Sequence, residues 1–148
     1  MKTVIDATDL IVGRLASYVA KQAILGEEFV IVNSDKAIIT GNRKQIMAKY
    51  RHLREMGTPT QGPFFPRRAK EILKRVIKGM VPYKQYKGKE ALRRVKCFNG
   101  VPTGLKEKPT TLESANVSKI PNTKFVTLKD VAEFLGGKFK AERGATKK

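Results

Sequence analysis

The side chains with the clearest chemical potential in this sequence are its cations. Lys and Arg number 31 against 13 Asp and Glu, which gives a formal net charge of +18 and an isoelectric point near 10.2. Residues 42–96 contribute 17 basic and three acidic side chains, whereas residues 1–41 contribute four and five. Such a density of like charge disfavours the compact state unless a polyanion neutralises it. Residues 42–96 are therefore predicted to form a nucleic-acid-binding surface.

One predicted helix, residues 67–80, spaces its cations regularly. Lys70, Lys74 and Lys78 recur every four residues, on a stripe expected to lie opposite the apolar one. Four residues advance a helix by about 6 Å, which is comparable with the spacing of phosphates along an RNA strand. The predicted RNA-binding residues are Arg14, Arg43, Lys44, Lys49, Arg51, Arg54, Phe64, Arg67, Arg68, Lys70, Lys74, Lys78, Lys84, Lys87, Lys89, Arg93 and Arg94.

The segment 57–66 favours RNA over DNA. It holds three prolines and two glycines, which prevent a regular element, and the pair Phe64-Phe65 just before Arg67-Arg68. Aromatic and basic side chains together suit single-stranded or looped RNA, and the sequence has no helix-turn-helix, zinc-finger or basic-zipper pattern. Stacking on bases and filling the core are both open roles for the two rings. Because the loop has few apolar residues, we expect it to become ordered on RNA.

The turn at residues 6–14 raises a different possibility, a nucleotide-dependent enzyme. A helix that starts directly after a parallel strand offers an anion site at its N-terminus. The turn has a single glycine, Gly13, however, and neither G-x-G-x-x-G nor G-x-x-x-x-G-K-[ST] occurs in the chain. We attribute Gly13 to the turn, and we expect Arg14 to contact a phosphate or a carboxylate. A general DNA-binding protein is the third class left open.

Catalytic and metal-binding residues are few. His52 is the only histidine and Cys97 the only cysteine, so the chain cannot form an internal disulfide or a cluster of His and Cys ligands. A pair of Cys97 and His52 is formally possible, but a cysteine in a predicted strand is usually a small buried hydrophobe. We expect no catalysis, no metal, no cofactor and no small-molecule substrate.

The cations require a scaffold, and the sequence predicts one of the α/β class. Predicted strands or extended segments are residues 3–6, 28–32, 37–40, 95–98 and 125–126. Predicted helices are residues 14–25, 42–53, 67–80, 88–94 and 127–135, with a long loop at 101–123. Strand, helix and strand within the first 32 residues make a βαβ unit and hence a parallel pair.

A single domain over residues 1–148 is expected from this length. We divide it into a βαβ core at 1–41, basic helices and a loop at 42–96, a strand, long loop and helix at 97–137, and a basic tail at 138–148. The longest aliphatic or aromatic run is only Phe29 to Val32, and the start of the sequence lacks a signal pattern, so we expect a cytoplasmic protein without a membrane span.

Several motifs, in the order in which they occur along the chain, resemble those of one family. They are Val12-Gly13-Arg14-Leu15-Ala16-Ser17, Val32-Asn33-Ser34 with Ile39-Thr40-Gly41-Asn42-Arg43-Lys44, Val76-Ile77-Lys78-Gly79-Met80-Val81-Pro82, and Gly88 with Ala91-Leu92 and Val95-Lys96-Cys97-Phe98-Asn99-Gly100-Val101-Pro102. Together, over residues 3–102, they resemble the large-subunit ribosomal protein L-thirteen (L13) family. Val101-Pro102 replaces the histidine-containing stretch of bacterial members, which points to the archaeal or eukaryotic form.

The resemblance implies a function and a fold. The expected fold is a three-layer α/β domain with a central, mainly parallel sheet flanked by helices, with long basic loops and a C-terminal tail. The expected function is structural: binding and stabilising large-subunit ribosomal RNA, beside neighbouring ribosomal proteins, during and after subunit assembly. The charge predicts a nucleic-acid partner and the segment 57–66 favours RNA, whereas the word ribosomal comes from the resemblance alone.

Overall fold

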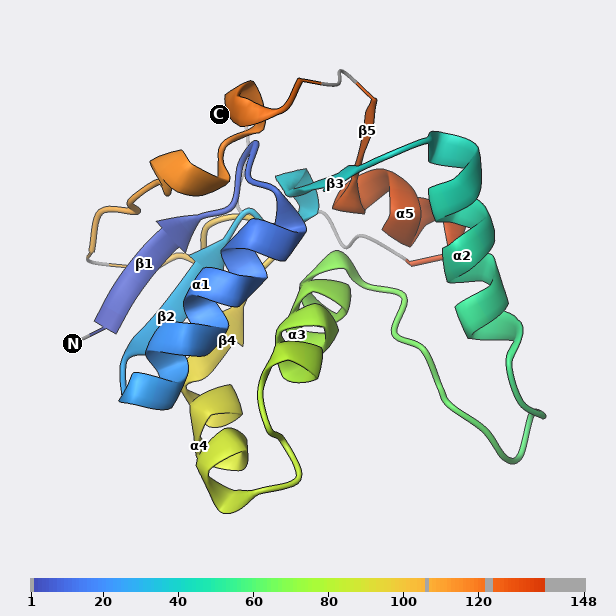
Figure 1. Cartoon of the computed structure of the whole chain (residues 1–148), viewed down its shortest axis with the longest axis horizontal. Helices are drawn as coiled ribbons and strands as arrows, with labels where there is room; N and C mark the ends of the chain where they lie inside the picture. Colours follow the sequence, from blue (N-terminus) through green and yellow to red (C-terminus); the bar gives the residue numbers. More distant parts are fainter. Residues whose placement is uncertain (1, 106, 122–123, 138–148) are drawn as a thin grey trace, which may run out of the picture.

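The computed structural model describes residues 2–105, 107–121 and 124–137 (Figure 1). The helices and strands are β1 (Lys2–Asp6), α1 (Val12–Leu25), β2 (Glu28–Val32), β3 (Ile38–Thr40), α2 (Arg43–Glu55), α3 (Ala69–Met80), α4 (Tyr86–Arg94), β4 (Val95–Cys97), β5 (Phe125–Thr127) and α5 (Leu128–Phe134). Short 3-10 turns lie at η1 (Ser34–Lys36), η2 (Glu113–Ala115) and η3 (Val117–Lys119). The predicted basic tail at 138–148 lies outside the described residues.

A three-stranded parallel sheet forms the centre of the fold. Its order is β1-β2-β4, with Ile31 paired to both Ile5 and Cys97. Every residue from Phe29 to Val32 is buried, as expected for a parallel strand covered on both faces. The predicted α/β class, parallel sheet and βαβ unit are therefore confirmed.

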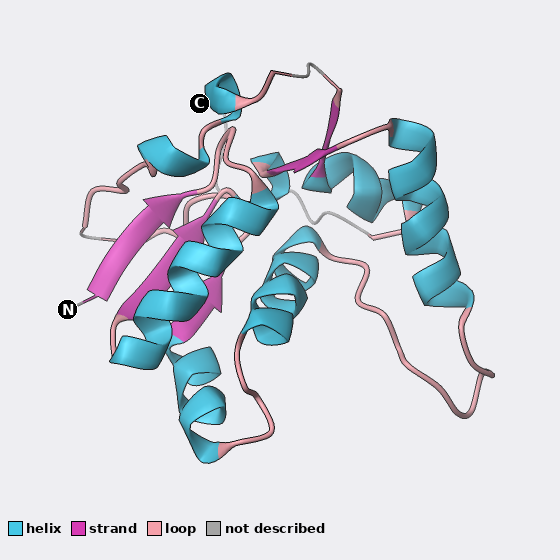
Figure 2. Ribbon diagram, viewed as in Figure 1, coloured by secondary structure: helices cyan, strands magenta, loops and turns pink. Residues whose placement is uncertain are grey.

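The two faces of this sheet are covered differently. Ile5, Phe29 and Ile31 belong to the large core that also contains the buried residues of α1 and α3. Val4, Val30 and Val32 form a second cluster, against which Phe98 and Leu105 pack. Helices thus cover one face, where Figure 2 shows α1 in front of the strands and roughly in line with them, and the loop after β4 covers the other.

Helix α1 shows why the first 30 residues fold as predicted. Its buried positions, which include Leu15, Val19 and Ala23, recur at helical spacing. Gly26 ends the helix at a φ of 115° and donates its backbone N–H to the Ala23 carbonyl, a conformation that favours glycine. Gly13, in contrast, lies inside the helix with nothing within 4 Å of its Cβ position, so the turn does not explain it.

Residues 37–40 do not join the parallel sheet. β3 pairs with β5 in a separate antiparallel sheet, with Ile39 opposite Val126. Thr127 then caps α5 by accepting the backbone N–H of Asp130 at 3.2 Å, as the sequence predicts. This second sheet brings α5 between α2 and α3 (Figure 1). No described helix is both long enough and apolar enough to span a bilayer.

Candidate nucleic-acid interface

The lysines of α3 do not share one exposed stripe. Lys78 is exposed, but Lys70 and Lys74 are half-buried: Lys74 lies near Cys97 of β4, and the backbone N–H of Lys70 donates to the Asn99 side chain, just after β4, at 3.0 Å. A step of four residues turns an α-helix by about 400°, so each lysine is rotated about 40° from the one before. The prediction that all three lie opposite the apolar face is therefore wrong for Lys70 and Lys74. The ammonium group of Lys78 lies 4.5 Å from the centre of the Tyr83 ring.

Two of the predicted RNA-binding arginines hold the protein itself together. Arg54 on α2 donates from Nη1 to the carbonyl of Leu135 at 2.9 Å, which joins α2 to the end of α5. Arg94 on α4 donates to the carbonyl of Ala23 at 3.2 Å, which joins α4 to the last turn of α1. Helix C-termini leave carbonyls without partners inside the helix, and a guanidinium satisfies them while its charge complements the dipole.

The remaining cations of α2 flank its apolar face. Ile46 and Met47 are buried, whereas Arg43, Lys44 and Arg51 line a hollow of about 380 Å³ beside α5. The Arg51 guanidinium lies 5.0 Å from the centre of the Phe134 ring. Lys49 is exposed on the other flank. The cations are therefore grouped toward α5.

The loop 57–66 contacts its own protein. The Cα atoms of Gly57 and Gly62 are so close that a Cβ on either would lie 2.7 Å from the other, and both have positive φ. Phe65 packs edge-on against Tyr50 with the ring centres 5.7 Å apart. The two phenylalanines therefore have different roles, since Phe65 is half-buried and Phe64 is 71% exposed.

A helix residue outside the predicted set fixes this loop. Arg75 donates from Nη1 to the carbonyl of Phe64 at 3.1 Å and lies 4.9 Å from the centre of the Phe65 ring. The sequence-based expectation that the loop becomes ordered on RNA did not include this contact, because Arg75 is ten residues or more from both phenylalanines along the chain. Arg67 and Arg68 follow the loop, and Arg68 pairs with Glu71 at 3.8 Å.

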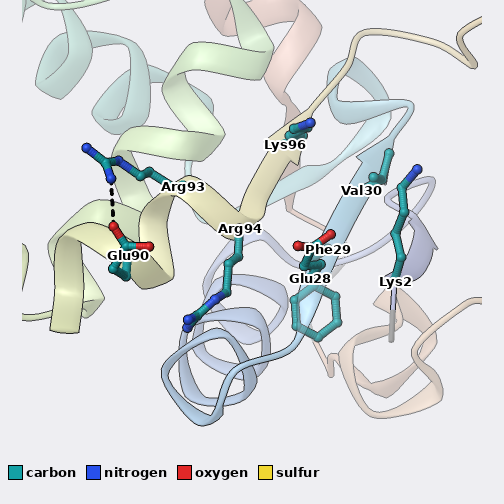
Figure 3. A pocket seen from close by; sticks show the side chains of 8 residues that line it. All are labelled: Lys2, Glu28, Phe29, Val30, Glu90, Arg93, Arg94 and Lys96. Atoms are coloured by element: carbon teal, nitrogen blue, oxygen red, sulfur yellow. Dashed lines mark hydrogen bonds and ion pairs between the residues drawn. The ribbon is translucent and has the colours of Figure 1, made fainter.

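The cations of α4 lie at the opposite end of α3 from the loop (Figure 1). Lys84, Lys87 and Lys89 are exposed on the α3–α4 turn and the first part of α4. Arg93 and Arg94 line a hollow of about 260 Å³ together with Lys2, Lys96, Glu28 and Glu90. Figure 3 shows Arg93 turned to Glu90, 2.7 Å away, while Arg94 points toward α1. Two carboxylates offset part of the charge here.

The start of α1 does not form a nucleotide site. The backbone N–H of Ile11 donates to the Ala115 carbonyl at 2.8 Å, and Arg14 donates to the Ser114 carbonyl at 3.4 Å, so η2 covers this end. Doubly wound sheets bind nucleotides where successive helices change faces. In the described sheet α1 and α3 lie on the same face, and that change does not occur.

Cys97 and His52 do not form a catalytic pair. His52 is exposed on α2, whereas Cys97 lies in β4 beneath α3. Burial raises the pKa of the Cys97 thiol to about 12, and the nearby Lys74 offsets this only in part. The thiol is therefore protonated near neutral pH and unsuited to nucleophilic attack.

Fold and surface together define a basic α/β protein that groups its exposed cations around α2 and α4. The described residues contain no cluster of three or more His, Cys, Asp or Glu that could hold a metal ion.

The chain belongs to the ribosomal protein L13 family, whose sequence model, described as Ribosomal protein L13, matches residues 1–103. It is similar to the large ribosomal subunit protein uL13 of Methanosarcina barkeri, with 48% identity over 93% of this chain and 99% of that protein. Identity to the proteins of the same name is 45% in Methanocaldococcus jannaschii, over 93% of this chain and 99% of that protein, and 43% in Natronomonas pharaonis, over 90% of both.

These comparisons confirm the resemblance seen in the motifs and assign the chain to the archaeal type. The alignments also extend well past residue 102, where the motifs end. The family is one of non-enzymatic structural proteins, so the prediction that this chain is not an enzyme is confirmed.

Proposed function

We propose that this chain is a structural constituent of the large ribosomal subunit and that its residues 42–96 bind and stabilise ribosomal RNA during and after assembly. The relatives that align over nine-tenths of the chain are named as proteins of that subunit. The proposal that RNA is bound rests on one observation: residues 42–96 contain 17 cations and only three carboxylates. Among the described residues, two of those carboxylates, Glu71 and Glu90, form ion pairs within 4.0 Å.

The role is mechanical. RNA helices repel one another through their phosphates, and fixed cations placed between them lower that repulsion. The parallel sheet with α1 and α3 supplies a rigid base for these charges. Within the described part of the chain, eight exposed cations of residues 42–96 have no ion pair, side-chain hydrogen bond or ring contact and are free to act this way: Arg43, Lys44, Lys49, Arg67, Lys84, Lys87, Lys89 and Lys96.

The test is the salt dependence of binding to a large-subunit RNA transcript. Each phosphate neutralised adds about 0.7–0.9 to the slope of log K against log salt. Replacing Lys84, Lys87 and Lys89 by Gln should lower that slope by about two. The control replaces Lys108, Lys119 and Lys124 by Gln, which removes the same charge outside residues 42–96. An equal fall in both variants, or no fall in the first, contradicts the assignment.

Two further expectations belong to this proposal. Neighbouring large-subunit proteins contact the chain, and it stays with the subunit when particles are sedimented after a high-salt wash. The single domain predicted for residues 1–148 remains a prediction. It is supported by one core cluster that includes residues from Ile5 on β1 to Leu135 after α5.

A further inference from the structure

We propose that a trough along α2 binds a single-stranded segment of RNA, with unstacked bases placed against Phe134 and Phe64. The α2 trough consists of three adjoining hollows, of about 380, 330 and 500 Å³, between α2, α5 and the loop 57–66. This inference rests on the proposed function for RNA as the partner, and it adds which form of RNA is bound and by which side chains.

The hollows adjoin one another, because neighbouring hollows share lining side chains. Arg51 and Phe134 line both the first and the second, and Arg54 lines both the second and the third. From Arg43 to Arg54 the helix advances by about 16 Å. The trough is therefore long enough for several nucleotides. The hydrogen bond from Arg54 to the Leu135 carbonyl, at 2.9 Å, joins the last turn of α2 to the end of α5.

Aromatic surface is available at both ends. Phe134 is 40% exposed, and the Arg51 guanidinium lies 5.0 Å from the centre of its ring. Bases stack on aromatic rings and on guanidinium planes, so a base can extend this pair. Phe64 is 71% exposed at the third hollow, and its backbone is held by Arg75. An exposed ring on a fixed backbone loses little entropy when a base stacks on it.

The charge of the trough matches a polyanion. Among the described residues, five cations and one carboxylate, Glu55, line the trough. The cations are Arg43, Lys44, Arg51, Arg54 and Arg67. A cationic groove interrupted by aromatic rings is the general arrangement for single strands, because phosphates follow the charges and bases stack on the rings. A duplex keeps its bases stacked on one another and presents phosphates only, so it leaves the aromatic side chains unused.

The experiment measures binding of the full chain to a labelled oligouridine and to an RNA duplex at the same salt concentration. Phe134→Leu keeps an apolar side chain against α2 but removes the ring, and Phe64→Ala removes an exposed ring. Each variant should weaken single-strand binding by roughly 5- to 150-fold and leave duplex binding unchanged. Tyr86→Ala is the control, since Tyr86 is 78% exposed on α4, away from the trough.

A fourth variant tests whether positive charge in the trough favours RNA binding. Glu55→Gln removes the only carboxylate among the described residues that line the trough and should tighten single-strand binding, by up to about fivefold at low salt. Thermal midpoints of all variants show whether the fold is kept.

Three outcomes would overturn the trough: unchanged single-strand affinity in both ring variants, equal losses for duplex and single strand, or displacement of oligouridine by poly-glutamate at equal charge concentration. None of them decides the proposed function, which is tested separately by the salt slope of the Lys84, Lys87 and Lys89 variant on folded RNA.

Discussion

The carbonyl oxygen of Pro82 lies where a Cβ atom of Gly88 would have to be. The backbone N of Tyr83 is only 2.8 Å from the same position. Gly88 does not have a positive φ, so the constraint is space and not backbone conformation. This contact packs the α3–α4 turn against the first turn of α4, next to the exposed Lys84 and Lys87.

Gly88→Ala is therefore expected to destabilise the protein by about 1–3 kcal/mol, because an added methyl group forces the backbone apart. Gly79→Ala is the matched control: Gly79 lies within α3, and nothing is within 4 Å of its Cβ position. That change should be neutral or stabilise by up to about 1 kcal/mol through helix propensity. Urea denaturation of both variants checks the pair, and equal effects would contradict the steric argument.

The elements that the sequence predicts well are those whose pattern is local. α1 and α3 each have an apolar period, and β2 has a continuous apolar run, that is visible within the element's own residues; the structure confirms all three to within two residues at either end. The pairing of β3 with β5 joins Ile38 to Thr127. No local pattern specifies that pair, so the second sheet and the position of α5 could not be predicted.

The same limit applies to the candidate interface. Sequence shows that Arg54 and Arg94 are cations, but not that each reaches a carbonyl 81 or 71 residues away along the chain. A guanidinium satisfies a helix terminus or a phosphate with the same donors. Phe134 was missed for a related reason, since its place beside Arg51 depends on the contact between α2 and α5.

Two adjacent arginines, Arg93 and Arg94, should contribute differently to the stability of the fold. Arg94→Gln removes the half-buried hydrogen bond to Ala23 and should cost about 1–2 kcal/mol of unfolding free energy. Arg93→Gln removes an ion pair whose arginine is 78% exposed, and it should change stability by less than about 0.5 kcal/mol. Both remove one positive charge. Equal denaturation midpoints for the two variants would show that the Arg94 contact does not stabilise the fold.

Asp6 makes the stability of the folded state depend on pH in the acid range. Partial burial raises the pKa of its carboxyl, but hydrogen bonds from Thr8 and Asn33, with Lys36 nearby, outweigh this and hold the pKa below its ordinary value of 3.8. A pKa lowered by folding means stability that is present above pH 3.8 and is lost as the pH falls through the folded value.

Asp6→Asn should therefore flatten the fall of the unfolding free energy below pH 3.8 and lower stability at neutral pH. Asp9→Asn is the control in the same turn, because Asp9 is exposed and its φ of 56° suits asparagine. Urea midpoints over a pH series give both slopes. The linkage is refuted if Asp6→Asn keeps the wild-type acid slope.

The loop 57–66 provides a test of preorganisation. If Arg75 fixes the loop through Phe64 and Phe65, Arg75→Gln should raise the population of its open form by about tenfold, since a charged hydrogen bond contributes about 1.5 kcal/mol. Chymotrypsin cleaves after aromatic residues, so the cutting rate at Phe64 reports this opening when reclosing is fast. Arg68→Gln is the control, with the same charge loss at the start of α3 and only the 3.8 Å pair with Glu71 removed. A loop ordered by RNA alone would be cut equally fast in all three proteins when RNA is absent.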